Sequence, residues 1–145
     1  VDEVGSFHYQ PEVASRSSFT LTAAGVTALH GVGIYSDQAI ERGIGYLIRE
    51  HEPFNKRWGV RTRNKGHYFF WYGHYYAVQA FYTYGNKFQG EVWTQYFEKL
   101  RGVLLGLQNK DGSFPNDVGP GLAFGTAAAC LILEIPYRFL PIFQR

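Results

Sequence analysis

One histidine lies where it could take part in chemistry. His74 begins an apolar segment and is flanked by Trp71, Tyr72 and Tyr75. Among aromatic side chains, an imidazole could act as an acid, a base or a ligand. The alternative is a capping or packing histidine whose ring nitrogens are both hydrogen-bonded inside the protein. The sequence leaves both interpretations open.

Two further features could bind a ligand, and each has a plainer interpretation. Residues 52–67 form a predicted loop, because Pro53, Gly59 and Gly66 interrupt regular structure. The loop carries five basic side chains: Lys56, Arg57, Arg61, Arg63 and Lys65. It could bind an anion such as a diphosphate, or it could simply be solvated. The single cysteine, Cys130, lies in an apolar segment, so we expect it to be small and buried.

Aromatic residues are unusually frequent, with 12 Phe, 11 Tyr and 3 Trp, and many gather in residues 68–76. One interpretation is packing in the core and between helices. The other is an aromatic-lined pocket for an apolar or cationic ligand. If that pocket exists, we expect it to be lined by Trp71, Tyr72, His74, Tyr75, Phe124 and Thr126.

Three similar segments must position these side chains. In them, Thr22, His74 and Thr126 hold the same place and lie 52 residues apart. Small residues and almost no charge predict three helices that are buried on most sides. Residues 37–50 and 91–108 between them show the apolar stripe and charged face of amphipathic helices.

The sequence therefore predicts an all-α single domain over residues 1–145, with no sheet beyond a short hairpin. The aromatic run at 69–76 could be a strand, but its second half aligns with the other apolar helices. Alternating buried and amphipathic helices indicate helical hairpins stacked side by side. The expected helices lie near residues 20–31, 37–50, 73–84, 91–108 and 124–134.

Five residues near the end of the fourth predicted helix form a recognisable motif: Arg101, Gly102, Gln108, Gly112 and Phe114. They resemble the repeat shared by squalene and oxidosqualene cyclases and protein prenyltransferase β-subunits, with Phe114 in place of the family's tryptophan. Residues 5–7 and 22–25 look like the same turn and inner helix in an earlier repeat. The resemblance implies an α/α-toroid-like stack of about two and a half hairpins, which is an incomplete barrel.

The residues of the motif suggest a structural role. Gln108 ends an outer helix, and its amide could tie that end to the start of the next helix. Gly112 permits a tight turn, and Phe114 can pack against the junction. We therefore expect these residues to stabilise the fold.

The catalytic motifs of the resembling enzymes do not recur in this chain. Class II terpene cyclases use Asp-x-Asp-Asp, and no aspartates here have that spacing. Protein prenyltransferases hold zinc with Asp, Cys and His, but Ala128 stands two residues before Cys130. We therefore expect no metal site and no cofactor.

Composition narrows the function further. A net charge of +2 without a basic run argues against a nucleic-acid partner, and no apolar stretch reaches transmembrane length. We expect a helical module that is non-catalytic in isolation and binds an isoprenoid-like or other apolar ligand, or a protein partner. The alternative is the C-terminal portion of an isoprenoid-handling enzyme, terpene cyclase or prenyltransferase-like. We also expect self-association, or contact with upstream repeats of a longer parent chain.

Overall fold

The computed structural model describes residues 3–10, 13–59, 67–87 and 90–139, and most of them are helical. The five α-helices are α1 (Phe19–Gly31), α2 (Gln38–Trp58), α3 (Tyr68–Lys87), α4 (Gly90–Leu105) and α5 (Leu122–Glu134). A short 3-10 helix, η1 (Ile135–Tyr137), follows α5. In the described chain the only sheet is the antiparallel hairpin of β1 (His8–Gln10) and β2 (Val13–Ser17). The all-α prediction is confirmed.

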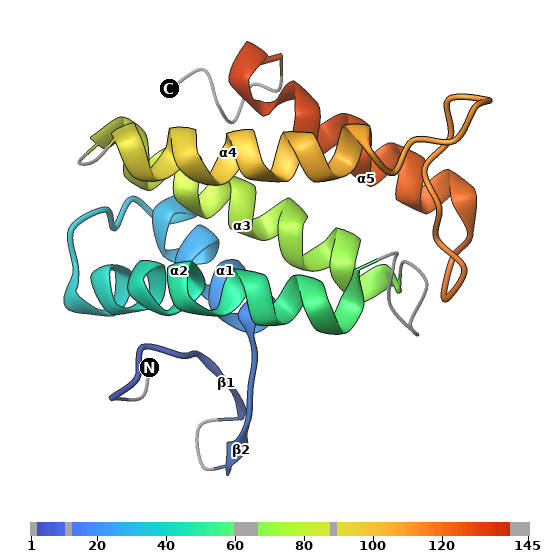
Figure 1. Ribbon diagram of the computed structural model, residues 1–145. Helices are drawn as coiled ribbons and strands as arrows, with labels where there is room; N and C mark the ends of the chain where they lie inside the picture. Colours follow the sequence, from blue (N-terminus) through green and yellow to red (C-terminus); the bar gives the residue numbers. More distant parts are fainter. Residues whose placement is uncertain (1–2, 11–12, 60–66, 88–89, 140–145) are drawn as a thin grey trace.

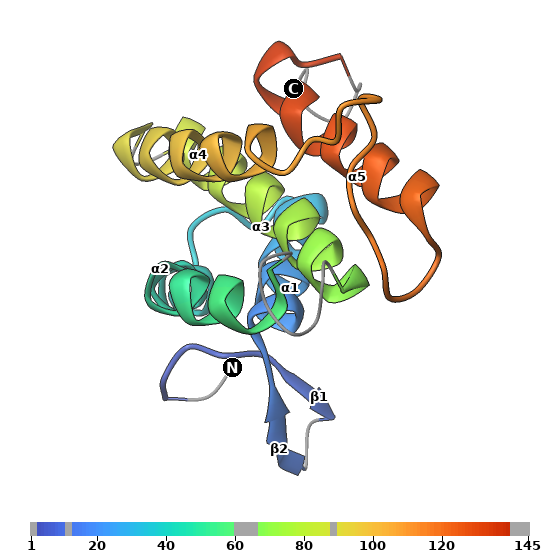
Figure 2. The ribbon, with the colours of Figure 1, turned by 45° about the vertical axis from the view of Figure 1, so that its right-hand side comes forward.

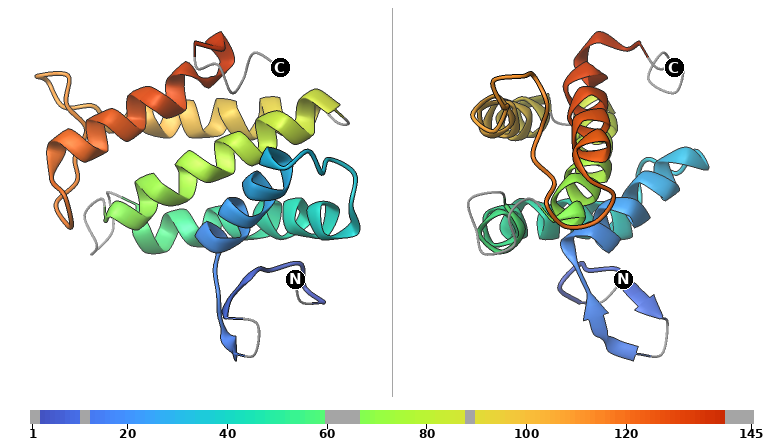
Figure 3. Two further views of the ribbon diagram at one scale, coloured as in Figure 1. Left: turned by 180° about the vertical axis from the view of Figure 1, so that it is seen from behind. Right: turned by 90° about the vertical axis from the view of Figure 1, so that its right-hand side faces the viewer.

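The helices form two layers (Figure 1). Seen end-on, α1, α3 and α5 lie in one layer, with α2 and α4 against one side of it (Figure 3). Helix α3 is central, because it packs against all four of the other helices (Figure 2). The hairpin projects away from the helices below α1 (Figure 1). The inner layer thus consists of the three helices that the sequence predicted to be buried.

Local sequence explains where two of the helices begin. The Ser18 hydroxyl accepts the Leu21 N–H at 3.1 Å, and the Asp37 carboxylate accepts the Ala39 N–H at 2.7 Å. Both side chains are N-caps: they accept hydrogen bonds from backbone N–H groups of the first helical turn that have no partner within the helix. The apolar stripe of α2, which contains Ile40, Ile44 and Leu47, is then buried in the core.

Helix α2 extends through part of the segment predicted to be a loop. It continues past Pro53 to Trp58, so the prediction of a loop over residues 52–67 is wrong for residues 52–58. The residues after the proline gain tertiary contacts: Phe54 is buried and stacks on Phe19 with ring centroids 4.4 Å apart. These contacts outweigh the backbone hydrogen bond that proline removes. Arg61, Arg63, Lys65 and Gly66 lie outside the described residues.

Boundaries of three other helices also differ from the predictions. Helix α3 ends at Lys87 rather than at residue 84, and α5 begins at Leu122 rather than at residue 124. Helix α3 begins at Tyr68 rather than at residue 73, so the strand alternative is wrong. Phe70 and Trp71 are buried, because they share a helical face with His74 at spacings of four and three. Helix α4 ends at Leu105, three residues before the predicted end, and a turn at Gly106 follows it.

One local arrangement occurs twice. Gly5-Ser6-Phe7 and Gly112-Ser113-Phe114 each begin with a glycine at positive φ, 95° and 87°. The Phe7 N–H donates to the Thr22 hydroxyl at 3.0 Å, and the Phe114 N–H donates to the Thr126 hydroxyl at 3.0 Å. The predicted correspondence between these two turns and helix starts is therefore present in the structure.

Gln108 has a smaller role than predicted. It is exposed, and its amide donates to the Gly112 carbonyl oxygen at 3.1 Å, within the turn. It does not tie α4 to the start of α5, because α4 has already ended. Phe114, by contrast, is buried and packs against Trp71 with ring centroids 5.9 Å apart.

We therefore predict different costs for the two residues. Phe114→Ala should lower the free energy of unfolding by about 3–5 kcal/mol, since it empties a buried aromatic site. Gln108→Ala should cost about 1 kcal/mol or less, because it removes one exposed hydrogen bond. Urea unfolding of both variants and the parent measures the difference. Equal costs would show that Phe114 does not anchor this turn.

Candidate functional site

The candidate residues on α3 point in two directions. Trp71 and His74 are buried on the core face of the helix. Tyr72 is 44% exposed, and Tyr75 is half-buried. Adjacent residues of a helix are about 100° apart around its axis, so Trp71 and Tyr72 cannot line one small cavity together. The structure divides the predicted pocket into a buried group and a surface group.

His74 is the centre of a buried network. Its Nε2 lies 2.6 Å from the Asn55 Oδ1 of α2, and its Nδ1 lies 2.7 Å from the Tyr96 hydroxyl of α4. The rings of Phe54 and Phe70 meet its ring edge-on, with centroids 5.4 and 4.6 Å away. With 1% of its surface exposed, His74 joins three helices. This environment matches the hydrogen-bonded packing histidine that the sequence left open.

The network fixes the protonation of its members. A neutral imidazole has one donor and one acceptor. With Nε2–H donating to the Asn55 oxygen, Nδ1 accepts the Tyr96 O–H. Burial, together with the nearby charge of His51, lowers the pKa of His74 to about 3. Burial also raises the pKa of Tyr96, so both side chains remain neutral at physiological pH.

A second buried group surrounds Trp71, at the start of α5. The Trp71 Nε1–H donates to the Pro115 carbonyl oxygen at 3.1 Å. A Cβ on Gly125 would come within 3.2 Å of that nitrogen, so the absence of a side chain there allows close packing. Phe124 and Thr126 are half-buried on α5. Trp71 and Thr126 therefore secure the turn before α5, and Thr126 does so through its bond to Phe114.

The surface group consists of Tyr72, Tyr75 and Tyr76, which we call the tyrosine face. The Tyr72 and Tyr76 hydroxyls share a hydrogen bond of 3.3 Å, and their ring centroids are 5.0 Å apart. Two causes raise the pKa of Tyr76 to about 12: mainly its hydrogen bond with Tyr72, and to a smaller extent its burial. The Thr27 hydroxyl of α1 donates to the Tyr76 carbonyl oxygen at 3.1 Å and joins the two helices there.

The remaining predicted residues do not join either group. Arg101 and Gly102 are exposed on α4, and the Arg101 guanidinium pairs with Glu98 at 2.7 Å. Cys130 is exposed, so its predicted burial is wrong; α5 lies at the end of the inner layer and has an uncovered side.

Among the described residues, no three His, Cys, Asp or Glu side chains form a group that could hold a metal ion. None of the described helices has the length and apolarity needed to cross a membrane.

Sequence reasoning missed a groove on the other side of α3. It has a volume of about 100 Å³ and lies between α2, which contributes Ile48 and His51, and α4, which contributes Val92 and Lys99. We call it the outer groove. Phe81 of α3 is almost fully buried beneath it. The groove could not be read from spacing, because its walls come from three helices that are distant in sequence.

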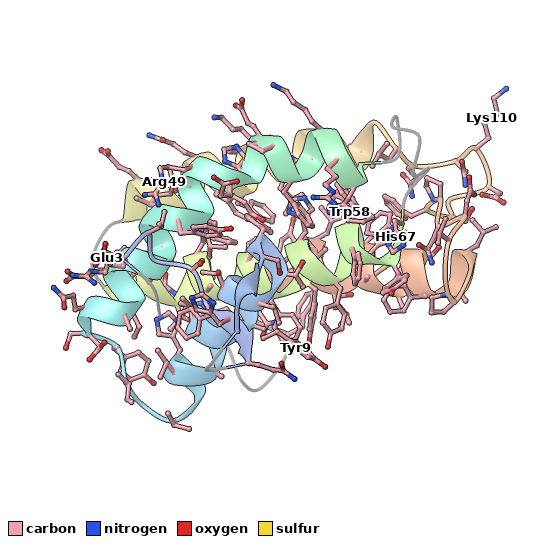
Figure 4. The ribbon with its side chains drawn as sticks, turned by 90° about the horizontal axis from the view of Figure 1, so that it is seen from below. Glu3, Tyr9, Arg49, Trp58, His67 and Lys110 are labelled. Carbon is pink, nitrogen blue, oxygen red and sulfur yellow. The ribbon has the colours of Figure 1, made fainter. Side chains whose placement is uncertain are left out.

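Another aromatic cluster lies where the beginning of α3 meets Trp58, the last residue of α2. The Trp58 and His67 side chains lie side by side, with ring centroids 4.8 Å apart (Figure 4). Phe69 meets the Trp58 ring edge-on at 5.1 Å, and the Arg57 guanidinium lies 5.1 Å from the Trp58 centroid. This cluster packs the end of α2 against the beginning of α3.

No protein-family model, curated protein or solved structure matches the chain. The resemblance to the cyclase and prenyltransferase repeat therefore stays a prediction, based on the motif residues themselves.

The buried histidine makes stability depend on pH. His74 has a folded pKa of about 3 against an ordinary 6.5, so the unfolded chain binds the proton more readily. Stability is thus highest above pH 6.5 and decreases as pH falls toward 3. Between pH 7.5 and 5, we expect this group to lower the free energy of unfolding by about 2 kcal/mol.

Urea unfolding at the two pH values tests this prediction. His74→Gln should be less stable at pH 7.5, but its further loss between pH 7.5 and 5 should be smaller than the parent's by about that amount. Because parent and variant share all other titrating groups, the difference between their two losses of unfolding free energy reports on His74 alone. If parent and variant lose the same free energy, His74 is not held neutral in the folded state.

Proposed function

We propose that this chain is a helical module of the α/α-toroid type that binds an apolar, isoprenoid-like ligand on the tyrosine face. In this proposal the module is non-catalytic in isolation. The observation that carries it is the exposure of Tyr72, which is 44% exposed. Tyr72 lies two residues before His74, whose ring contacts α2 and α4, so helical rotation places Tyr72 on roughly the opposite side of α3.

The toroid assignment is supported by two features of the described chain. Inner helices α1, α3 and α5 alternate along the sequence with outer helices α2 and α4 (Figure 3). The two Gly-Ser-Phe turns also meet inner-helix threonines through the same hydrogen bond. Such repetition is typical of stacked hairpins, in which each unit contacts its neighbours in the same way.

The chemistry of the tyrosine face supports an apolar ligand. Tyrosine rings offer broad apolar surface and lose little conformational freedom on binding. The hydroxyls of Tyr72 and Tyr76 satisfy one another, so their rings need no polar group from the ligand.

Titration with farnesol, followed by intrinsic fluorescence, tests the proposed site. Tyr72→Ala should weaken binding about fivefold, because losing apolar contact of about 40 Å² costs about 1 kcal/mol. Tyr9→Ala is the matched control, since Tyr9 is 62% exposed on the hairpin, which projects from the helices below α1 (Figure 1). Equal affinity in the parent and Tyr72→Ala would place the site elsewhere.

We also expect the chain to self-associate through the inner layer. Ala123, Ala127 and Cys130 form an exposed apolar stripe on α5, and such a stripe favours contact between copies. Light scattering after size exclusion at low micromolar concentration should give a two-fold dimer of the 16.5 kDa chain. Ala127→Lys should give a monomer, whereas Val103→Lys on α4 should not. A monomeric parent would contradict the expectation.

A further inference from the structure

The outer groove combines apolar walls with a positively charged rim. Phe81 and the ring of Tyr96 form its base, with centroids 4.2 Å apart. Ile48 is 46% exposed beside it, and Val92 is half-buried on the opposite wall. Its volume of about 100 Å³ equals roughly three waters of liquid volume, which suits a chain of a few carbon atoms.

The polar side chains at the groove favour a negatively charged ligand over a positively charged one. Lys99 and Gln95 line it from α4, and both supply N–H donors. No acidic side chain is among its described lining residues. Glu98, the residue before Lys99, is already paired with Arg101 at 2.7 Å. The groove is therefore complementary to an anion at its rim and to hydrocarbon at its base.

The His51 ring forms part of the wall in a fixed orientation. Its Nδ1 lies 2.9 Å from the Ile48 carbonyl oxygen, and because a carbonyl can only accept, Nδ1 carries the proton. The ring meets that of Tyr96 edge-on, with centroids 6.2 Å apart. The Tyr96 hydroxyl points to His74, so only the apolar part of this tyrosine faces a ligand.

We propose that the outer groove binds a short aliphatic carboxylate, with its carbon chain against Ile48 and Val92 and its carboxylate on Lys99. This site is independent of the tyrosine face, since α2 and α4 lie on the other side of the inner layer (Figure 3). Either site can therefore exist without the other.

Titration of the isotopically labelled chain with butyrate, followed by NMR, tests the proposal. We expect saturable shifts at Phe81, Val92 and Lys99 in the millimolar range. 1-Butanol, which has the same chain without the charge, should bind more weakly. Lys99→Gln should weaken butyrate about fivefold, near the upper limit for an exposed ion pair, and should leave butanol unchanged.

Two more variants make the result decisive. Val92→Trp should fill the groove and abolish the shifts from both probes, while the spectrum elsewhere reports that the fold is intact. Lys110→Gln is the matched charge control, because Lys110 projects outward from the loop after α4 (Figure 4) and is not among the lining residues of the groove. This variant should bind butyrate like the parent. The proposal is overturned if butyrate gives no saturable shifts at the groove, or if Lys99→Gln and Lys110→Gln bind it equally.

Discussion

A neutral imidazole buried among phenylalanines requires a hydrogen-bond partner at each nitrogen, because an unpaired polar atom there would cost about 1–3 kcal/mol. His74 meets this requirement only if Asn55 and Tyr96 reach it from two other helices. Asn55 is in place because α2 continues past Pro53, and Tyr96 is in place because α4 packs against α3. The length of α2 and the positions of both outer helices are therefore linked to one side chain.

The sequence predicted the helices correctly where the signal lies within one helix or in a regular repeat. The apolar stripe of α2, its Asp37 cap and the 52-residue spacing of the inner helices are local or periodic features, and they predicted the helix order correctly. The extension of α2 was not predictable, since Pro53 argues locally for a break and the compensating stack of Phe54 on Phe19 is tertiary. The start of α3 was missed for the same reason: its aromatic run reads as a strand until Phe70 and Trp71 are seen to share a buried face with His74.

The predicted pocket illustrates a different limit. Proximity in sequence placed Trp71, Tyr72 and His74 together, but helical rotation sends Tyr72 to the surface and the other two into the core. The repeat shows the same effect of context. Thr22 and Thr126 accept the N–H of a turn, whereas His74, at the equivalent position, bonds to side chains of α2 and α4. A spacing can therefore identify equivalent positions without showing which partner each position has.

The buried network also bears on the outer groove. Tyr96 contributes its ring to the groove and its hydroxyl to His74, so the network that ties α2 to α4 also holds the base of the groove. Its wall is fixed as well, because the His51 ring is bonded to the Ile48 carbonyl. A ligand that enters a groove with such a base does not have to order it, and this preorganisation favours binding of even a small molecule. The tyrosine face has a different support: the Thr27 hydroxyl holds the backbone of Tyr76, and Tyr76 in turn holds the Tyr72 ring through their hydroxyl hydrogen bond and edge-on contact.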